Sequence, residues 1–219
     1  TGERGRKEDE ESRNVVISKA FYISKYEISQ AQWMVGTGVN PSYFKGGSLP
    51  VEKVSWKESK EFCRKNGMAL PTEAQWEYAC RGGVSAPFYW GVDWDRKRVN
   101  NASYWMREDV HDPVSFERSG FPEKWMSMGA GSIPVGSFSA NAFGLYDMIG
   151  NVSEWCEDWY GQYGKDEVDP LGPNFGREKV CRGGSWFDFS SGLRCSARYR
   201  HYPAHETETI GLRTIFVQK

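Results

Sequence analysis

The sequence predicts an irregular, loop-rich α+β fold, and three observations carry this prediction. Aromatic residues make up 15% of the chain and include 10 Trp, while 24 of the 219 residues are Gly. That combination is typical of proteins in which large rings fill the gaps between turns. Three helix-capping patterns predict short helices, and segments rich in β-branched residues near both ends predict strands. At this length the chain can bury a sizeable core.

Each predicted helix starts at a capping box, in which a hydroxyl residue and a Glu or Gln three positions later satisfy the first free amide groups. The three pairs are Ser29 with Gln32, Ser55 with Glu58, and Thr72 with Gln75. We expect the first helix to end near Met34, the second at Gly67, and the third before Gly82.

Segments rich in β-branched and aromatic residues predict the strands. They cover residues 15–28, 133–138, 180–186, 193–200 and 210–217. We expect residues 15–219 to form one domain. Residues 1–14 carry many charges and no apolar periodicity, so we expect this tail to be disordered or weakly attached.

Charge and hydropathy argue against two classes of function. The formal net charge is -1, and a balanced charge lacks the basic footprint of a protein that binds nucleic acid or a membrane surface. The chain contains no run of apolar residues long enough for a membrane-spanning helix. The oligomeric state does not follow from the sequence.

The five cysteines stand singly, without the spacing of a zinc site. Cys63 and Cys80 lie on apolar helix faces and are predicted to be small buried side chains. One disulfide among Cys156, Cys181 and Cys195 is compatible with the sequence, which does not choose between the pairings.

The apolar stretch from residue 141 to 159 is interrupted by glycines and predicts a buried loop rather than a helix or strand. Its two spaced acids, Asp147 and Glu154, together with backbone carbonyls between them, are suitable ligands for a hard cation such as calcium. The alternative is a loop satisfied by its own hydrogen bonds, with Glu154 paired with a distant Arg.

Two late loops, residues 187–192 and 201–209, combine aromatic residues, His and small polar residues without a secondary-structure signal. This is the chemistry of a binding surface, because rigid rings supply contact area beside adaptable hydrogen-bonding groups. An ordinary surface loop is the alternative.

Seven motifs resemble the formylglycine-generating-enzyme (sulfatase-modifying factor) family. The central motif is GLYDMIGNVSEW, residues 144–155, and the others cover residues 21–33, 40–44, 49–56, 70–79, 182–186 and 210–213. They follow the family's order from about residue 15 to the C-terminus. The resemblance implies a single C-type-lectin-like fold with short helices and twisted antiparallel strands. It also implies a structural calcium ion held by the Asp147 side chain, the Gly150 and Val152 carbonyls, and Glu154.

The resemblance also bears on catalysis. Family enzymes oxidise a sulfatase cysteine to formylglycine, using a copper-holding cysteine pair that follows the Gly-Gly-Ser-aromatic motif. Here residues 187–194 contain no cysteine, and Cys195 matches a non-catalytic position. Because Cu(I) chemistry requires thiolate ligands, we expect no copper and no oxidase activity. The alternative is a family enzyme that acts on a protein cysteine, or one that uses His201 or His205.

The family also includes variable proteins of diversity-generating retroelements, in which adenine-directed mutagenesis changes Asn codons near the 3′ end of the gene. That region's framework persists here over residues 182–213, and other residues hold the usual Asn positions. We therefore predict a non-catalytic display protein, at the cell surface or outside the cell, that binds a protein or glycan. The predicted contact residues are Phe187, Asp188, Phe189, Tyr199, His201, Tyr202, His205 and Thr207. Ordinary drift in a binding module is the alternative origin.

Overall fold

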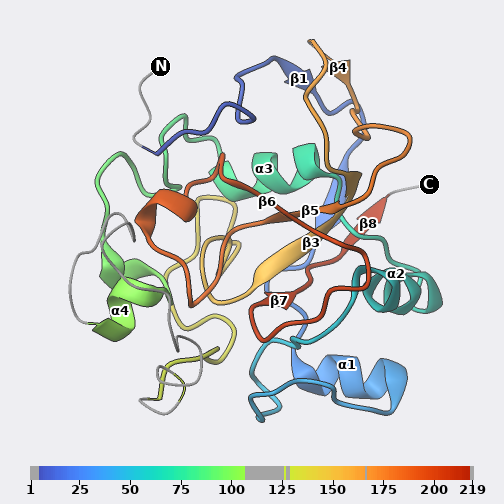
Figure 1. Cartoon of the computed structure of the whole chain (residues 1–219), viewed down its shortest axis with the longest axis vertical. Helices are drawn as coiled ribbons and strands as arrows, with labels where there is room; N and C mark the ends of the chain where they lie inside the picture. The colour runs from blue at the N-terminus through green and yellow to red at the C-terminus, as the bar shows by residue number, and fades with distance from the viewer. Residues whose placement is uncertain (1–4, 107–125, 127–128, 166, 218–219) are drawn as a thin grey trace.

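The computed structural model describes residues 5–106, 126, 129–165 and 167–217. Short elements are joined by long loops, as the α+β prediction requires (Figure 1). The helices are α1 Gln30–Thr37, α2 Trp56–Lys65, α3 Glu73–Arg81 and α4 Ala102–Met106, with 3-10 turns η1 Arg96–Arg98 and η3 Ser190–Gly192. The strands are β1 Val15–Val16, β2 Phe21–Ile23, β3 Ser153–Trp159, β4 Glu167–Val168, β5 Lys179–Arg182, β6 Arg198–His201, β7 Ile210–Gly211 and β8 Ile215–Val217.

The three predicted capping boxes are present, one at the start of each of α1, α2 and α3. In each, the hydroxyl accepts from the third backbone amide while the Glu or Gln side chain accepts from the cap's own amide. Helix α1 runs beyond Met34 to Thr37, because the left-handed backbone that stops it belongs to Gly38, with φ of 80°.

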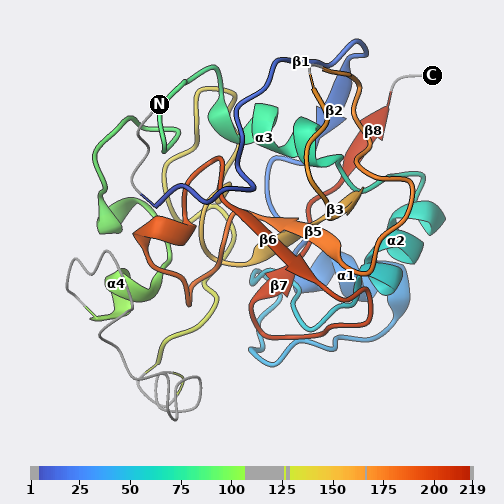
Figure 2. The ribbon, with the colours of Figure 1, turned by 45° about the horizontal axis from the view of Figure 1, so that its top comes forward.

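The central sheet has the strand order β6-β5-β3-β7. Strand β5 is antiparallel to both β3 and β6, whereas β7 is parallel to β3. Two smaller pairs complete the fold: β2 with β8, antiparallel, and β1 with β4, parallel. The pairing of β2 with β8 joins an early and a late segment of the chain, which lie side by side in Figure 2.

Two apolar clusters lie on opposite faces of the central sheet, because successive residues of a strand point to opposite sides. Trp155 of β3 packs in the cluster that contains Trp33 of α1 and Phe62 of α2. The next residue, Cys156, packs in the cluster of Trp76 from α3. Figure 1 shows α3 on one side of the sheet and α1 and α2 on the other.

Some strand predictions are wrong in extent. Residues 133–138 form no strand, and β6 begins at Arg198 rather than at residue 193. The segment 210–217 is divided into β7 and β8. Buried arginines explain two of these breaks, since the guanidinium groups of Arg194 and Arg213 are fully enclosed and need partners from several directions. Regular alternation along a strand does not supply such partners.

The N-terminal segment differs from the expected weak attachment over its described residues 5–14. The Glu10 carboxylate is buried and pairs with the Arg194 guanidinium at 2.5 and 2.9 Å, across 184 positions of the chain. The Asp9 side chain accepts a hydrogen bond from the Tyr160 hydroxyl, and the Asp9 carbonyl accepts one from Arg198 at 3.0 Å. These partners are distant in sequence, so composition alone does not reveal them.

All five cysteines are free thiols and buried, which confirms the prediction for Cys63 and Cys80. None of the three late cysteines is bridged. The Sγ atom of Cys195 instead lies 3.3 Å from that of Cys80 on α3. Burial raises the pKa of the Cys80 thiol well above its usual value and keeps it protonated. No helix in the described part of the chain has the length and apolar character needed to cross a membrane.

Candidate functional site

The eight predicted contact residues lie on three segments at and beyond the β5–β6 edge of the central sheet. Phe187, Asp188 and Phe189 follow β5, Tyr199 and His201 belong to β6, and Tyr202, His205 and Thr207 lie in the loop from β6 to β7. Tyr199 reaches the first group through its hydroxyl, which lies 3.0 Å from an Asp188 carboxylate oxygen, whereas His201 pairs with Lys179 at the other end of β5. The eight side chains nevertheless divide into two sets with different surroundings.

One of the eight, Phe189, is buried and does not fit an exposed contact surface, while Asp188 and Tyr199 are half-buried and hydrogen-bonded to each other. Phe189 is only 7% exposed and packs in an apolar cluster with Trp186 and Ala102. The Asp188 carboxylate accepts hydrogen bonds from the Ser185 amide at 2.9 Å and from the Tyr199 hydroxyl at 3.0 Å. Burial raises the pKa of Asp188, and these hydrogen bonds oppose the shift. Phe189, Asp188 and Tyr199 therefore stabilise the bend after β5.

The remaining five side chains reach solvent wholly or in part. Tyr202 is 62% exposed and His205 is exposed, while Phe187, His201 and Thr207 are half-buried. The rings of His201 and His205 stack with centroids 4.8 Å apart and planes 3° from parallel. Trp155 meets His201 edge-on at 6.2 Å. Burial and the neighbouring His205 lower the pKa of His201 to about 4, so this imidazole is neutral at pH 7.

The loop from β6 to β7 is held through its main chain. The Thr207 carbonyl accepts a hydrogen bond from the Lys53 amide at 3.0 Å, and the Pro203 carbonyl accepts one from the Trp56 amide at 3.1 Å. The Glu208 carbonyl accepts from the Trp186 indole nitrogen at 3.1 Å. Because all three are backbone acceptors, the path of the loop does not depend on the identity of its side chains.

The sequence reasoning missed an aromatic row that extends this surface. Phe187 packs edge-on against Trp186, whose ring meets Phe44 at 5.7 Å, and Phe44 meets Tyr43 at 5.2 Å. Tyr43 is exposed. The only signal was that residues 40–44 form one of the family-like motifs, and it says nothing about their place beside Trp186.

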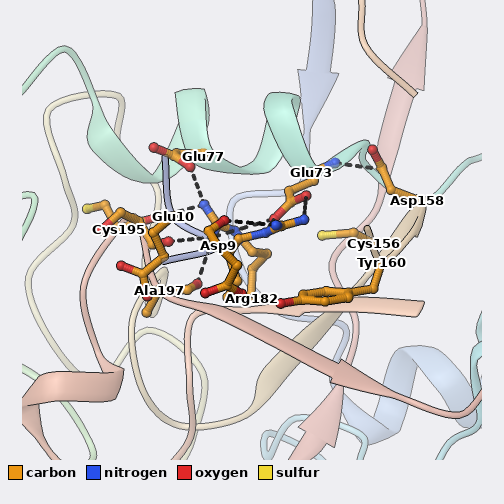
Figure 3. A network of polar contacts seen from close by, with 12 residues as sticks. Asp9, Glu10, Glu73, Glu77, Cys156, Asp158, Tyr160, Arg182, Cys195 and Ala197 are labelled. Atoms are coloured by element: carbon orange, nitrogen blue, oxygen red, sulfur yellow. Dashed lines mark hydrogen bonds and ion pairs between the residues drawn. The ribbon is translucent and has the colours of Figure 1, made fainter. Parts of the chain in front are cut away.

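A buried polar network around Arg182 joins the segment that precedes β6 to helix α3 (Figure 3). The Arg182 guanidinium donates to the carbonyls of Cys195, Ser196 and Ala197 at 2.7 to 2.9 Å and pairs with the Glu77 carboxylate. These bonds fix the turn that leads into β6. The Arg182 Nε has no hydrogen-bond partner among the described residues, so it is the two terminal nitrogens that order this turn.

The predicted ion loop brings three buried carboxylates near one guanidinium. The carboxylates belong to Glu27, Asp147 and Glu154, and the cation is Arg213. Glu154 accepts from Arg213 at 2.9 Å and from the Trp76 indole at 2.6 Å, so its pairing with a distant Arg, the alternative raised by the sequence, is present. Burial raises the pKa of Asp147 to about 6 and that of Glu27 well above its usual range.

These donors fit calcium in chemical type, because all are hard oxygen ligands and three acids beside one Arg leave an excess of negative charge. Asp147 has φ of 52° and Gly150 φ of 80°, so the loop has the unusual backbone expected from its glycines. Across the described residues, no three His, Cys, Asp or Glu side chains are arranged to hold an ion. Backbone carbonyls would therefore have to complete any calcium site.

The fold and these motifs define the class of protein. The chain belongs to the formylglycine-generating-enzyme family, since the model of the sulfatase-modifying factor enzyme 1-like domain matches residues 1–217. The predicted resemblance is confirmed.

Among individual proteins, the chain is similar to the formylglycine-generating enzyme of Mus musculus, with 34% identity over 193 residues. The match covers 85% of this chain and 49% of the mouse protein, so the chain spans about half the length of that relative. Its fold is similar to that of Treponema denticola variable protein 1, with a TM-score of 0.75 and 24% identity over 90% of this chain and 84% of that one. The fold is also similar to that of PvdO from Pseudomonas aeruginosa, with a TM-score of 0.78 and 24% identity. That match covers 99% of this chain and 88% of PvdO. At such identities these two structures show the fold alone.

Proposed function

We propose that this protein is a non-catalytic ligand-binding protein, and that Phe187, His201, Tyr202, His205 and Thr207 contact a protein or glycan ligand. The proposal keeps five of the eight predicted contact residues. Asp188, Phe189 and Tyr199 become the support beneath them. Presentation at the cell surface belongs to the same proposal.

The observation that carries this proposal is the separation of backbone from side chain in the loop from β6 to β7. Its carbonyls at Pro203, Thr207 and Glu208 are bound by the rest of the fold, while Tyr202 and His205 extend into solvent. Substitutions at such positions leave the core packing unchanged. A ring and an imidazole on a fixed loop supply contact area at low entropic cost.

The second candidate is an oxidase of the kind found among the family's enzymes, and the family membership favours it. Against it stands the absence of cysteine from residues 187–194. All five thiols are buried, whereas copper chemistry on a protein substrate requires accessible thiolates. Oxygen uptake with a sulfatase-derived cysteine peptide and Cu(I) separates the two functions, since any turnover would overturn the display proposal.

Binding is tested by screening the protein against a glycan array and a panel of purified surface proteins. The double variant Tyr202→Ala/His205→Ala should lose any specific partner found, because truncated contact aromatics cost on the order of 2 kcal/mol each. The matched control is Tyr22→Ala, which removes an equally exposed ring on β2. A partner retained by the double variant contradicts the assignment.

The retroelement origin is tested in the genome. We expect a reverse transcriptase gene nearby and a template repeat that differs from this gene only at adenines within the codons of the variable positions. Differences spread over all four bases would instead indicate ordinary drift.

We further propose a structural calcium ion held by Asp147, Glu154 and the carbonyl oxygens of Gly150 and Val152. Calcium at a hundredfold excess over its Kd should stabilise the fold by about 2.7 kcal/mol, and chelation should remove this gain. Melting curves with calcium, magnesium and chelator provide the measurement, and Asp147→Asn should lose most of the response. Metal-free protein with an unchanged melting curve contradicts the ion.

A further inference from the structure

A groove on the other side of the molecule, away from the contact loops, has one wall made by a strand edge. The groove has a volume of about 1000 Å³ and lies between the chain segment 10–23, which includes β1 and β2, and helix α3. Figure 2 shows β2 between β8 and α3. The edge of β2 that faces away from β8 therefore borders this space.

The hydrogen-bonding direction of β2 follows from its register. The Ser24 amide donates to the Thr214 carbonyl at 2.9 Å and the Thr214 amide donates to the Ser24 hydroxyl at 3.2 Å, so Ser24 and Thr214 face each other across the ladder. In an antiparallel ladder hydrogen-bonded pairs alternate, so Tyr22 bonds to Phe216 whereas Phe21 and Ile23 point their amide and carbonyl groups outward. The backbone of Ile215, opposite Ile23, follows this alternation. Its amide and carbonyl face away from β2 and form hydrogen bonds of 2.8 and 2.9 Å with Ala69.

The outward groups of Phe21 and Ile23 have no hydrogen-bond partner among the described residues. An edge strand with free donors and acceptors is a template for another strand. Natural proteins cover such edges or protect them with charge or proline, and the only charge beside β2 on its N-terminal side is Lys19.

The side chains along the groove suit an extended apolar segment. Phe21 packs edge-on against Tyr78 of α3 at 6.4 Å, and Tyr78 contacts Phe143 at 5.5 Å. Tyr78 is 54% exposed and Phe143 is 48% exposed. Both side chains are therefore about half exposed, and both line the groove.

Three of the groove's acids are paired, whereas Glu11 at its margin is exposed. Glu73 pairs with Arg198 at 2.7 Å, Glu77 with Arg81 at 2.8 Å, and Glu10 with Arg194. An occupant beside Tyr78 and Phe143 therefore meets backbone groups and aromatic rings, with the exposed charges of Glu11 and Lys19 at the margin of the groove. A helix would leave the outward groups of β2 unpaired, so the chemistry selects an extended chain.

From this juxtaposition we propose that the free edge of β2 binds an extended peptide segment of a partner protein by strand addition. The peptide's backbone pairs with Phe21 and Ile23, and its apolar side chains pack on Tyr78 and Phe143. Main-chain pairing supplies affinity in this mode, and the side-chain contacts supply specificity. The site is independent of the proposed ligand surface.

The probe is a fluorescent peptide with the sequence of residues 213–219, which contains the β8 segment that already pairs with β2 on its other edge. Two N-methylated forms are compared, one methylated at the equivalents of Thr214 and Phe216, the other at Ile215 and Val217. Strand addition predicts that one form binds like the parent while the other loses binding at least about tenfold, because alternate amides face β2. Equal behaviour of the two forms, or no binding of the parent at millimolar concentration, overturns the proposal.

The protein variants isolate the backbone group. Phe21→Pro removes the outward amide at the first residue of the strand, a position where proline is tolerated. Phe21→Ala removes the same ring but keeps the amide. We expect peptide affinity to be about tenfold weaker for the Pro variant than for the Ala variant, with similar melting temperatures. Equal affinities contradict pairing at this edge.

Two further measurements identify the occupant. Tyr202→Ala/His205→Ala should bind the peptide normally, so loss of the display function leaves this proposal intact. Sedimentation of the full chain tests a second copy as the occupant. If the chain dimerises and Phe21→Pro makes it monomeric, the free edge of β2 mediates self-association and the partner-peptide proposal is wrong.

Discussion

The segment after β5 and the loop after β6 contain the same kinds of residue but have opposite roles. Residues 187–189 are Phe, Asp and Phe, and residues 201–205 include His, Tyr and His. Phe189 is enclosed beside Trp186, and Asp188 is bound by Ser185, whereas Tyr202 extends into solvent. Aromatic and polar content therefore does not distinguish a binding surface from its support. The partners of each side chain do.

The largest expected effect separates the two segments by stability. Phe189→Ala removes a buried ring and should lower the free energy of unfolding by about 3 to 5 kcal/mol. Tyr202→Ala should change the free energy of unfolding by less than about 0.5 kcal/mol, since the Tyr202 ring is largely exposed. Urea unfolding of both variants provides the comparison. Similar losses would mean that both rings belong to the core.

An intermediate effect tests whether Asp188 supports the bend. Asp188→Ala leaves the Ser185 amide without an acceptor and leaves the Tyr199 hydroxyl only the Gly192 carbonyl at 3.1 Å, and we expect a loss of about 2 kcal/mol. Tyr199→Phe should cost about 1 kcal/mol, and the double variant less than the sum of the two. Strict additivity would show that the hydrogen bond between them contributes nothing.

The smallest effect concerns pH and the outward loop. Folding lowers the pKa of His201 to about 4, whereas an unfolded His titrates near 6.5. The unfolded chain therefore binds more protons between these values, and stability falls as pH drops from about 6.5 to 4. Because the His201 side chain is only half-buried and solvent screens its charge, we expect the free energy of unfolding to fall by on the order of 1 kcal/mol over this pH range.

The measurement is the difference in unfolding free energy between the wild type and His201→Gln over this pH range, which cancels the contribution of the buried acids. His205→Ala is the control, and it should raise the pKa of His201 because it removes a like charge. A difference that does not change with pH would show that His201 titrates normally.

Local signals in the sequence predicted the local structure. The hydroxyl and its partner at Ser29, Ser55 and Thr72 specify helix starts within four residues, so all three capping boxes are where they were expected. The family motifs predicted the fold for a related reason, since a fixed order of several long motifs is restrictive. The prediction of a strand at residues 133–138 was wrong, because tertiary context outweighs the β propensity of this segment.

The sequence by itself determined the helix starts, the glycine-bent loop that carries Asp147 and Glu154, the absence of cysteine from residues 187–194, and membership of the family. Only the tertiary structure decided which late aromatics are buried, that Glu10 binds Arg194, and that the outer edge of β2 is free. The physical reason is the distance along the chain between the partners of each interaction. Caps and turns are satisfied by atoms a few residues away, whereas burial and ion pairing depend on partners up to 184 positions distant, whose meeting no local pattern encodes.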